Sequence, residues 1–344
     1  MKDRVESDTD ELIRERKQRI FSRKTLILLV LSLALVIFLV TRIDMERTVH
    51  TFRNADPLLL LACCVLYFMS NFFKALRFRV LLAGERVKLY DLFIIASYHN
   101  FFNQIFPART GELTFVYYLK KISRSDISKG IHSLFVVRIF DLIIVSVFFV
   151  GSVIIYFGRS TSGSLVLAGI IFFILSTAVL FNLKWFAVLF DRILQWCVRR
   201  FNLGDKKIIR SVVDRTDAIV EEFSSFKTRS FIPGLAITSI LVWVALYTMF
   251  FTSIRAFGID IQYIQSVAGA TGGVLTNVLP INSFGSFGTL EAGWAGGFVL
   301  VGMSGQDAIT TGFGYHLITF IASGLAALTG LLLYRSGPGS RKSA

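Results

Sequence analysis

The chain contains 344 residues, of which 54% are apolar and 17% are charged, and its mean hydropathy is +0.63. Soluble domains carry about a quarter charged residues, so this composition excludes a soluble globular protein and a disordered chain. Three cysteines (Cys63, Cys64 and Cys197) provide no disulfide framework and no zinc-ligand spacing. The net charge of +14 must therefore be interpreted from where the charges fall.

Six apolar stretches approach the roughly 20 residues that a helix needs to cross the hydrocarbon core of a bilayer. They predict membrane spans at about 25–41, 57–73, 131–157, 164–183, 231–254 and 308–334. The first has the outline of a signal peptide, but no small-residue cleavage site follows it, so we expect a retained span.

Two further apolar stretches are interrupted by turn-forming residues. Residues 89–121 are broken at 106–112, and residues 263–302 are broken at 279–288. Each half is too short to cross a bilayer by itself. Each stretch therefore predicts a hairpin of two half-helices.

Lysine and arginine side chains gather on one side of this topology. With the N-terminus inside, the inside segments hold 30 of the 37 basic residues and the outside loops hold five. The inside segments are 1–24, 74–88, 120–130, 184–230 and 335–344. The positive-inside rule thus predicts cytoplasmic N- and C-termini in the cell inner (plasma) membrane. The basic excess is an insertion signal and a contact with the anionic leaflet, and it predicts no nucleic-acid partner.

The interrupted stretches occupy equivalent places in an internal repeat. Each is preceded by an ordinary span and followed by a long final span, which gives repeats at about 57–157 and 231–334. By the charge distribution, the first hairpin enters from the inside and the second from the outside. This pattern is typical of transporters whose binding site lies near the bilayer midplane.

The expected fold is an all-α polytopic membrane protein with about six transmembrane helices and two re-entrant hairpins in an inverted repeat. We expect one membrane domain over residues 25–335, with interfacial cytoplasmic helices at about 184–230 between the repeats. Residues 1–24 and 336–344 are predicted to be cytoplasmic tails.

The sequence at these breaks carries a family resemblance. The resembling residues are Asn103-Gln104-Ile105-Phe106-Pro107-Ala108-Arg109-Thr110-Gly111-Glu112, Arg138-Ile139-Phe140-Asp141 and the glycine-rich run from Leu279-Pro280 to Glu291. They resemble the lysylphosphatidylglycerol synthase transmembrane (flippase-like) family over roughly residues 25–335. The resemblance implies an integral membrane protein that moves a lipid, or a lipid-linked group, between leaflets.

That family includes the membrane half of the bacterial multiple peptide resistance factor and stand-alone relatives. The chain departs from the full-length resistance factor in two ways. No soluble aminoacyl-transferase domain follows the membrane region, so we do not expect synthase chemistry. Thr110 also stands where the family leads us to expect glycine.

Ionisable side chains at bilayer depth are costly unless they are paired or hydrated. Arg109 and Glu112, at the tip of the first hairpin, predict a site for a lipid phosphate or else a local ion pair that closes the turn. Arg138 and Asp141 are three residues apart on one helix. They predict either an internal pair or contacts that hold the tip, with Asp141 meeting Arg109 and Arg138 meeting Glu112.

Polar residues near the second break extend this candidate site. Glu291 is expected to cap the helix that follows. The alternatives are that it pairs with Arg109 or that it acts as a switch by gaining and losing a proton. The groove that would receive a headgroup is predicted to be lined by amides and hydroxyls, each of which could equally bridge two helices. These residues are Asn103, Gln104, Asn277, Asn282, Ser283 and Ser286. His99 and His316 are expected to be hydrogen-bonded packing residues.

The predicted function is that of a lipid flippase or scramblase, with no cofactor and no metal. No P-loop motif occurs, so transport would be downhill or driven by ions. The expected partners are membrane lipids: an anionic or aminoacylated phospholipid, or a polyprenyl-linked lipid. Two alternatives stay open, namely an enzyme acting on a lipid and a scaffold for a lipid-modifying glycosyl or aminoacyl transferase. Association with a second copy of the chain is also left open.

Overall fold

The computed structural model describes residues 33–106, 111–158, 228–278 and 284–336, except 86 and 124, and isolated positions between 167 and 196. All secondary structure in these residues is helical. The helices are α3 (Met45–Arg53), α4 (Pro57–Leu81), α5 (Leu89–Ile105), α6 (Glu112–Ser123), α7 (Ile127–Phe157), α12 (Thr228–Ala256), α13 (Tyr263–Val278), the 3₁₀ turn η3 (Phe284–Ser286), α14 (Thr289–Leu300) and α15 (Gly305–Ser336).

Four of these helices are long and apolar enough to cross a membrane: α4, α7, α12 and α15. They confirm four of the six predicted spans. The predicted span 25–41 is helical at 33–40 and otherwise lies mostly outside the described residues, and 164–183 is described only at isolated positions. Six spans therefore stay a prediction, as do the interfacial helices and the two tails.

Helix α4 is longer than the predicted span 57–73. It begins where the Asp56 carboxylate accepts hydrogen bonds from Leu58 N (2.8 Å) and Leu59 N (3.2 Å), as an N-cap residue does. It continues past the predicted end at residue 73 to Leu81. Lys74 and Arg77 are thus part of the helix and not of a loop, and both side chains line an internal cavity.

The two interrupted stretches form pairs of short helices at the predicted breaks. The first pair is α5 with α6, and the second is α13 with α14. The longest of these helices, α5, has 17 residues, which gives about 26 Å at 1.5 Å per residue and is less than the hydrocarbon thickness. The breaks are therefore as expected, whereas the entry of each pair from opposite sides stays a prediction.

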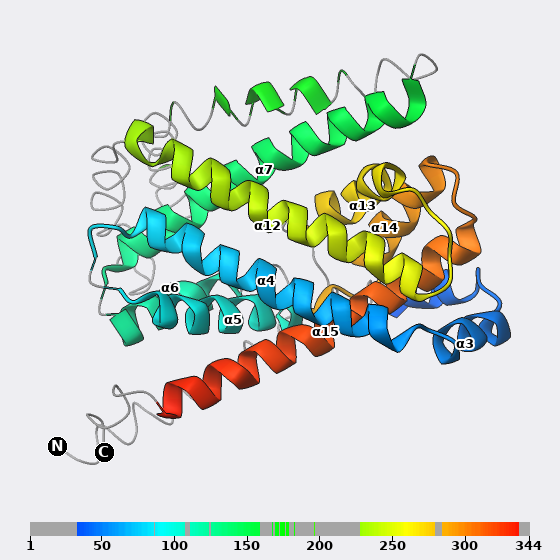
Figure 1. The fold of residues 1–344 in the computed structure, drawn as a ribbon, viewed down its shortest axis with the longest axis horizontal. Coiled ribbons are helices and arrows are strands. Elements are labelled where there is room, and N and C mark those ends of the chain that lie inside the picture. Colours follow the sequence, from blue (N-terminus) through cyan, green and yellow to red (C-terminus); the bar gives the residue numbers. More distant parts are fainter. Residues whose placement is uncertain are drawn as a thin grey trace.

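The second half of the molecule packs as the first half does. α4 lies against α12, and the contact of α5 with α15 has its counterpart in that of α13 with α7. In Figure 1, α4 and α12 run side by side in opposite directions, and so the blue end of α4 adjoins the yellow end of α12. Their ends are joined by a hydrogen bond from Asp56 N to Ala256 O of 2.8 Å.

The outer faces of the long helices are apolar. On α4, Leu58, Leu61 and Val65 expose more than half of their surface. Exposed apolar side chains of this kind suit a helix that contacts the hydrocarbon of a bilayer. At one end, α3 joins the start of α15, where Asp44 N donates to Gln306 Oε1 (2.7 Å) and Arg47 pairs with Asp307 (2.9 Å). The polar residues of interest lie inside, between the two halves.

Candidate functional site

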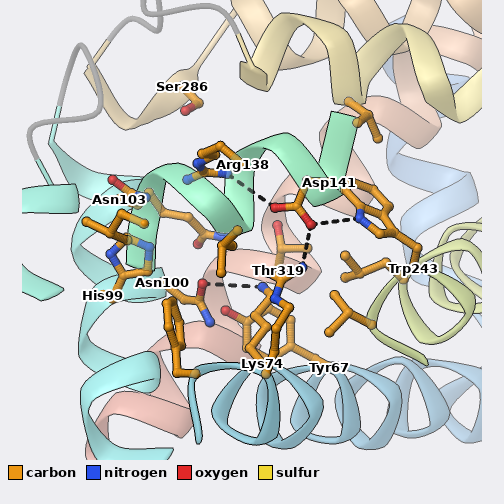
Figure 2. A pocket seen from close by; sticks show the side chains of 18 of the residues that line it. Tyr67, Lys74, His99, Asn100, Asn103, Arg138, Asp141, Trp243, Ser286 and Thr319 are labelled. Atoms are coloured by element: carbon orange, nitrogen blue, oxygen red, sulfur yellow. Dashed lines mark hydrogen bonds and ion pairs between the residues drawn. The ribbon is translucent and has the colours of Figure 1, made fainter. Parts of the chain in front are cut away.

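A cavity of about 220 Å³, with apolar, polar and charged side chains in its wall, lies between the two halves. Its walls come from α4, α5 and α7 of the first half and from α12, α13, η3 and α15 of the second half. Figure 2 shows Lys74 on α4, Asn100 on α5 and Asp141 on α7 pointing toward one another, with Trp243 of α12 at the side. Side chains from both halves thus enclose one charged space.

A buried ion pair joins α4 to α7 at this cavity. Arg77 NH1 donates to Asp141 Oδ1 at 2.6 Å, and Trp243 Nε1 donates to the same oxygen at 2.9 Å. The side chains of Arg77 and Asp141 are only 3% and 10% exposed. Removing two charges from water is costly, and such a pair is maintained only when further hydrogen bonds satisfy it. Trp243 and Ser239, which accepts from Arg77 at 3.4 Å, supply them from α12.

Lys74 stands one turn before Arg77 and forms no ion pair with an acidic side chain in the described part of the chain. Its Nζ donates to Asn100 Oδ1 at 3.3 Å. Asn100 in turn donates to Asn71 Oδ1 at 2.7 Å, and Asn71 donates to Ser97 Oγ at 2.7 Å. Among the described residues, no carboxylate lies within 4.0 Å of the Lys74 ammonium. The amide chain fixes Lys74 in place without neutralising it.

The sequence analysis missed both of these basic residues. It assigned Lys74 and Arg77 to a cytoplasmic segment because a hydropathy reading ends a span at the first charges. A signal was present in the run from Phe78 to Leu82, which remains mostly apolar after the charges. Apolar residues on both sides of two charges one turn apart indicate a helix that continues with one polar face.

Arg138 and Glu112 form a second ion pair next to the first. Arg138 NH2 and Nε lie 2.7 and 3.1 Å from Glu112 Oε1, and the side chains are 30% and 28% exposed. This contact of α7 with the start of α6 is one of the two predicted tip contacts. Arg138 NH1 also lies 3.9 Å from Asp141 Oδ2. The Asp141 carboxylate is otherwise held by Arg77 and Trp243, and its predicted contact with Arg109 lies outside the described residues.

Glu291 lies in a different environment. One of its carboxylate oxygens accepts from Gly288 N at 2.7 Å and so caps α14, as one of the sequence-based alternatives predicts. The other lies 2.6 Å from His316 Nδ1 of α15. Both side chains are almost fully buried, at 0% and 2%, and neither lines the cavity. His316 also stacks on Phe287 with 4.4 Å between ring centroids, as expected of a packing residue.

Of the remaining residues predicted for the site, some are described by the structure and others are not. Asn103 and Gln104 line the cavity, as does Ser286, and Gln104 Oε1 accepts from Ser323 Oγ at 2.8 Å. Buried Asn103 Oδ1 has no hydrogen-bond partner among the described residues. Arg109, Asn282 and Ser283 lie outside the described residues, and the side chain of Asn277 at the end of α13 is not described. A role of any of these residues in binding a substrate stays a prediction.

Comparison with known proteins identifies the membrane domain. Residues 25–327 match the family model of the lysylphosphatidylglycerol synthase TM region. The chain belongs to this family. Within the lysylphosphatidylglycerol synthase TM family match lie the cavity, all four long helices except the end of α15, and both pairs of short helices. The family and its extent agree with the resemblance found in the sequence, and the protein is a multi-pass membrane protein.

A curated relative matches part of the same region. The glycosyltransferase AglD of Haloferax volcanii is 32% identical over 123 residues, which are 35% of this chain and 19% of that protein. The chain therefore aligns with about a fifth of that relative. The likeness does not extend over the whole glycosyltransferase, so its activity is not transferred to this chain.

Proposed function

We propose that this protein moves the headgroup of a phosphate-bearing lipid between leaflets through the cavity between its two halves. The observation that carries the proposal is the cavity itself, which lies between the long apolar helices and has charged side chains in its wall. It is lined by three basic side chains (Lys74, Arg77 and Arg138) and one acidic side chain (Asp141). Ionisable groups at membrane depth are costly and mark pathways for polar substrates. Guanidinium groups bind phosphate well.

The arrangement of the halves supports the same proposal. We propose that residues 57–157 and 231–334 are an inverted repeat whose broken hairpins enter from opposite sides. The opposite directions of α4 and α12 and the equivalent contacts of the two halves support it (Figure 1). In such transporters the site lies between the repeats, and alternating access comes from motion of one repeat against the other. The position of the cavity between the two halves supports this mechanism.

The apolar outer surface provides a place for the acyl chains of the lipid while its headgroup crosses. A headgroup that crosses inside the protein leaves its acyl chains in the bilayer, so the helices beside the cavity must accept hydrocarbon outside. The exposed apolar residues of α4, which include Leu61, Val65 and Met69, give the helix such a face. Lys74 and Arg77 on the same helix line the cavity. α4 thus separates the polar and apolar parts of a lipid.

Reconstitution in liposomes tests the proposal. The protein is reconstituted with lipids that are fluorescent on the acyl chain, and the outer leaflet is bleached with dithionite, so that the rate of leaflet exchange is measured. Wild-type protein is expected to accelerate exchange, and Arg138→Ala and Arg109→Ala variants of normal melting temperature are expected to lose it. Lys120→Gln, at an exposed lysine of α6, is the control. Absence of exchange with every anionic, zwitterionic and polyprenyl lipid would overturn the proposal.

A second candidate function is an accessory membrane subunit for a lipid-modifying transferase. The partial likeness to a protein named a glycosyltransferase favours it. In that case a partner enzyme would bind the chain, and replacement of the cavity charges would leave the partner's activity unchanged. Co-purification of a transferase together with unaltered product formation in the Arg138→Ala variant would favour this function over transport.

A further inference from the structure

The charges around the cavity are not balanced. Among the described residues, the carboxylates of Asp141 and Glu112 are each engaged by a guanidinium group, those of Arg77 and Arg138 respectively. The only hydrogen-bond acceptor of the Lys74 ammonium within the described segments is the neutral amide of Asn100. His99, which also lines the cavity, adds no negative charge in either protonation state. One positive charge therefore remains uncompensated in the described part of the site.

Two donors are available for an anion at this place. Lys74 Nζ has three protons, and among the described residues one of them is donated, to Asn100 Oδ1. Arg77 Nε is buried and has no hydrogen-bond partner among the described residues. A buried donor that lacks a partner is costly, and an anion that bridges Lys74 and Arg77 would satisfy both groups. Phosphate oxygens are suitable acceptors for such a pair.

The described residues of the same site provide no free carboxylate for a positively charged group in a lipid headgroup. An ammonium group would need a free carboxylate, yet Asp141, the one carboxylate among the described lining residues, is bound to Arg77, and nearby Glu112 is bound to Arg138. It would also lie close to three basic side chains in a site of low dielectric, where repulsion is strong. Neutral hydrogen-bonding groups are available instead. Asn103 Oδ1 is buried and has no hydrogen-bond partner in the described segments, and Ser286 and Thr319 line the cavity.

We propose that the cavity selects lipids whose headgroup is a monoanionic phosphodiester that carries an uncharged, hydroxylated group. The phosphodiester binds at Lys74 and Arg77 Nε, and a hydroxyl donates to Asn103 Oδ1. This inference rests on the proposed transport function and specifies its substrate. Glycerol and sugar headgroups share this chemistry. A zwitterionic headgroup, or one with an added aminoacyl group, is disfavoured although the family is described by lysylphosphatidylglycerol synthesis.

The experiment compares four acyl-labelled lipids in the same proteoliposomes. They are phosphatidylglycerol, a short-chain glycosyl phosphoryl polyprenol, phosphatidylethanolamine and lysylphosphatidylglycerol. At least one of the first two is expected to exchange about tenfold or more faster than the last two, since one hydrogen bond to a charged group corresponds to roughly that factor. Faster exchange of phosphatidylglycerol alone, or of the glycosyl lipid alone, identifies which of the two headgroups is the substrate.

Variants at Lys74 test its assigned role. Lys74→Gln removes the uncompensated charge and is expected to slow exchange of the favoured lipid about tenfold, whereas Lys74→Arg keeps the charge and most of the rate. Loss of an unpaired buried charge does not endanger folding, and the melting temperature checks this. Lys120→Gln on the surface of α6 is the matched control and is expected to leave the rate unchanged.

The outcomes separate this inference from the proposed function. Equal exchange of all four lipids, or faster exchange of the aminoacylated lipid, overturns the selectivity and leaves transport standing. An unchanged rate in a folded Lys74→Gln variant overturns the role of Lys74. Exchange of none of the four lipids removes the transport function and the inference together.

Discussion

The two pairs of short helices follow one plan but have different surroundings. In each, a glutamate near the start of the second helix meets a basic residue on the following long helix: Glu112 meets Arg138, and Glu291 meets His316. The first pair of side chains is about one-third exposed beside the cavity, whereas the second is almost fully buried. A permanently charged arginine suits a site that holds an anion, and a histidine suits a packed interior.

The contact between the helices differs in the same way. In the second pair, α13 and α14 approach so closely that a Cβ added to Gly272 would lie 2.9 Å from Gly297 Cα. Such small-residue contacts allow tight packing of membrane helices. In the first pair, the close approach that a glycine marks lies at the tip, where a Cβ on Gly111 would lie 2.5 Å from Asn103 N. From this comparison we propose that the second pair supports the fold and that the first pair borders the path of the headgroup.

The largest effect on stability is expected from Glu291→Ala. The substitution leaves the buried Gly288 N–H and His316 without their acceptor, and loss of one partner of a buried pair costs about 3–5 kcal/mol. The melting temperature in detergent, followed by tryptophan fluorescence, should fall strongly, and Glu291→Gln should lose less because it keeps an acceptor. Normal melting with abolished lipid exchange would reverse the roles that we assign to the two helix pairs.

An intermediate effect is expected from Gly297→Ala. The new methyl group would meet the carbonyl oxygen of Gly269 across the α13–α14 contact, and such overpacking costs about 1–3 kcal/mol. The neighbouring Gly296 provides a matched control, because a Cβ there has no atom within 4 Å. Thermal denaturation should therefore distinguish the two alanine variants. Equal melting temperatures would show that the tight contact does not support the fold.

The smallest effect on stability, with a clear effect on transport, is expected from Glu112→Gln. Because the Glu112–Arg138 pair is partly exposed, its loss should cost no more than about 1 kcal/mol. Arg138 would then be free to bind a phosphate too tightly or in a different position, so the exchange rate should change severalfold in liposomes while melting hardly shifts. A large loss of stability without a change in exchange would make the first pair a support as well.

The sequence predicts local features, such as helix breaks and spans, better than it predicts which side chains contact one another across the fold. Proline and glycine at 106–112 and 279–288 place the breaks where α5 and α13 end, and apolar length predicts four of the long helices. The partner of Asp141 could not be predicted in this way, since Arg77 lies 64 residues away and on another helix. Local spacing instead favours Arg138, which lies 3.9 Å away. The position of Lys74 inside the fold depends on the same long-range contacts.

The buried contact between Arg77 and Asp141 also constrains biosynthesis. Helix α4 leaves the ribosome 64 residues before the carboxylate that neutralises it, and its apolar stretch ahead of Lys74 has only 17 residues, 57–73. Arg77 of the nascent α4 therefore lacks its Asp141 counter-ion until α7 has been synthesised. An unpaired charge at membrane depth is costly, so we expect Asp141 to be needed for the assembly of α4 with α7 as well as for the wall of the cavity.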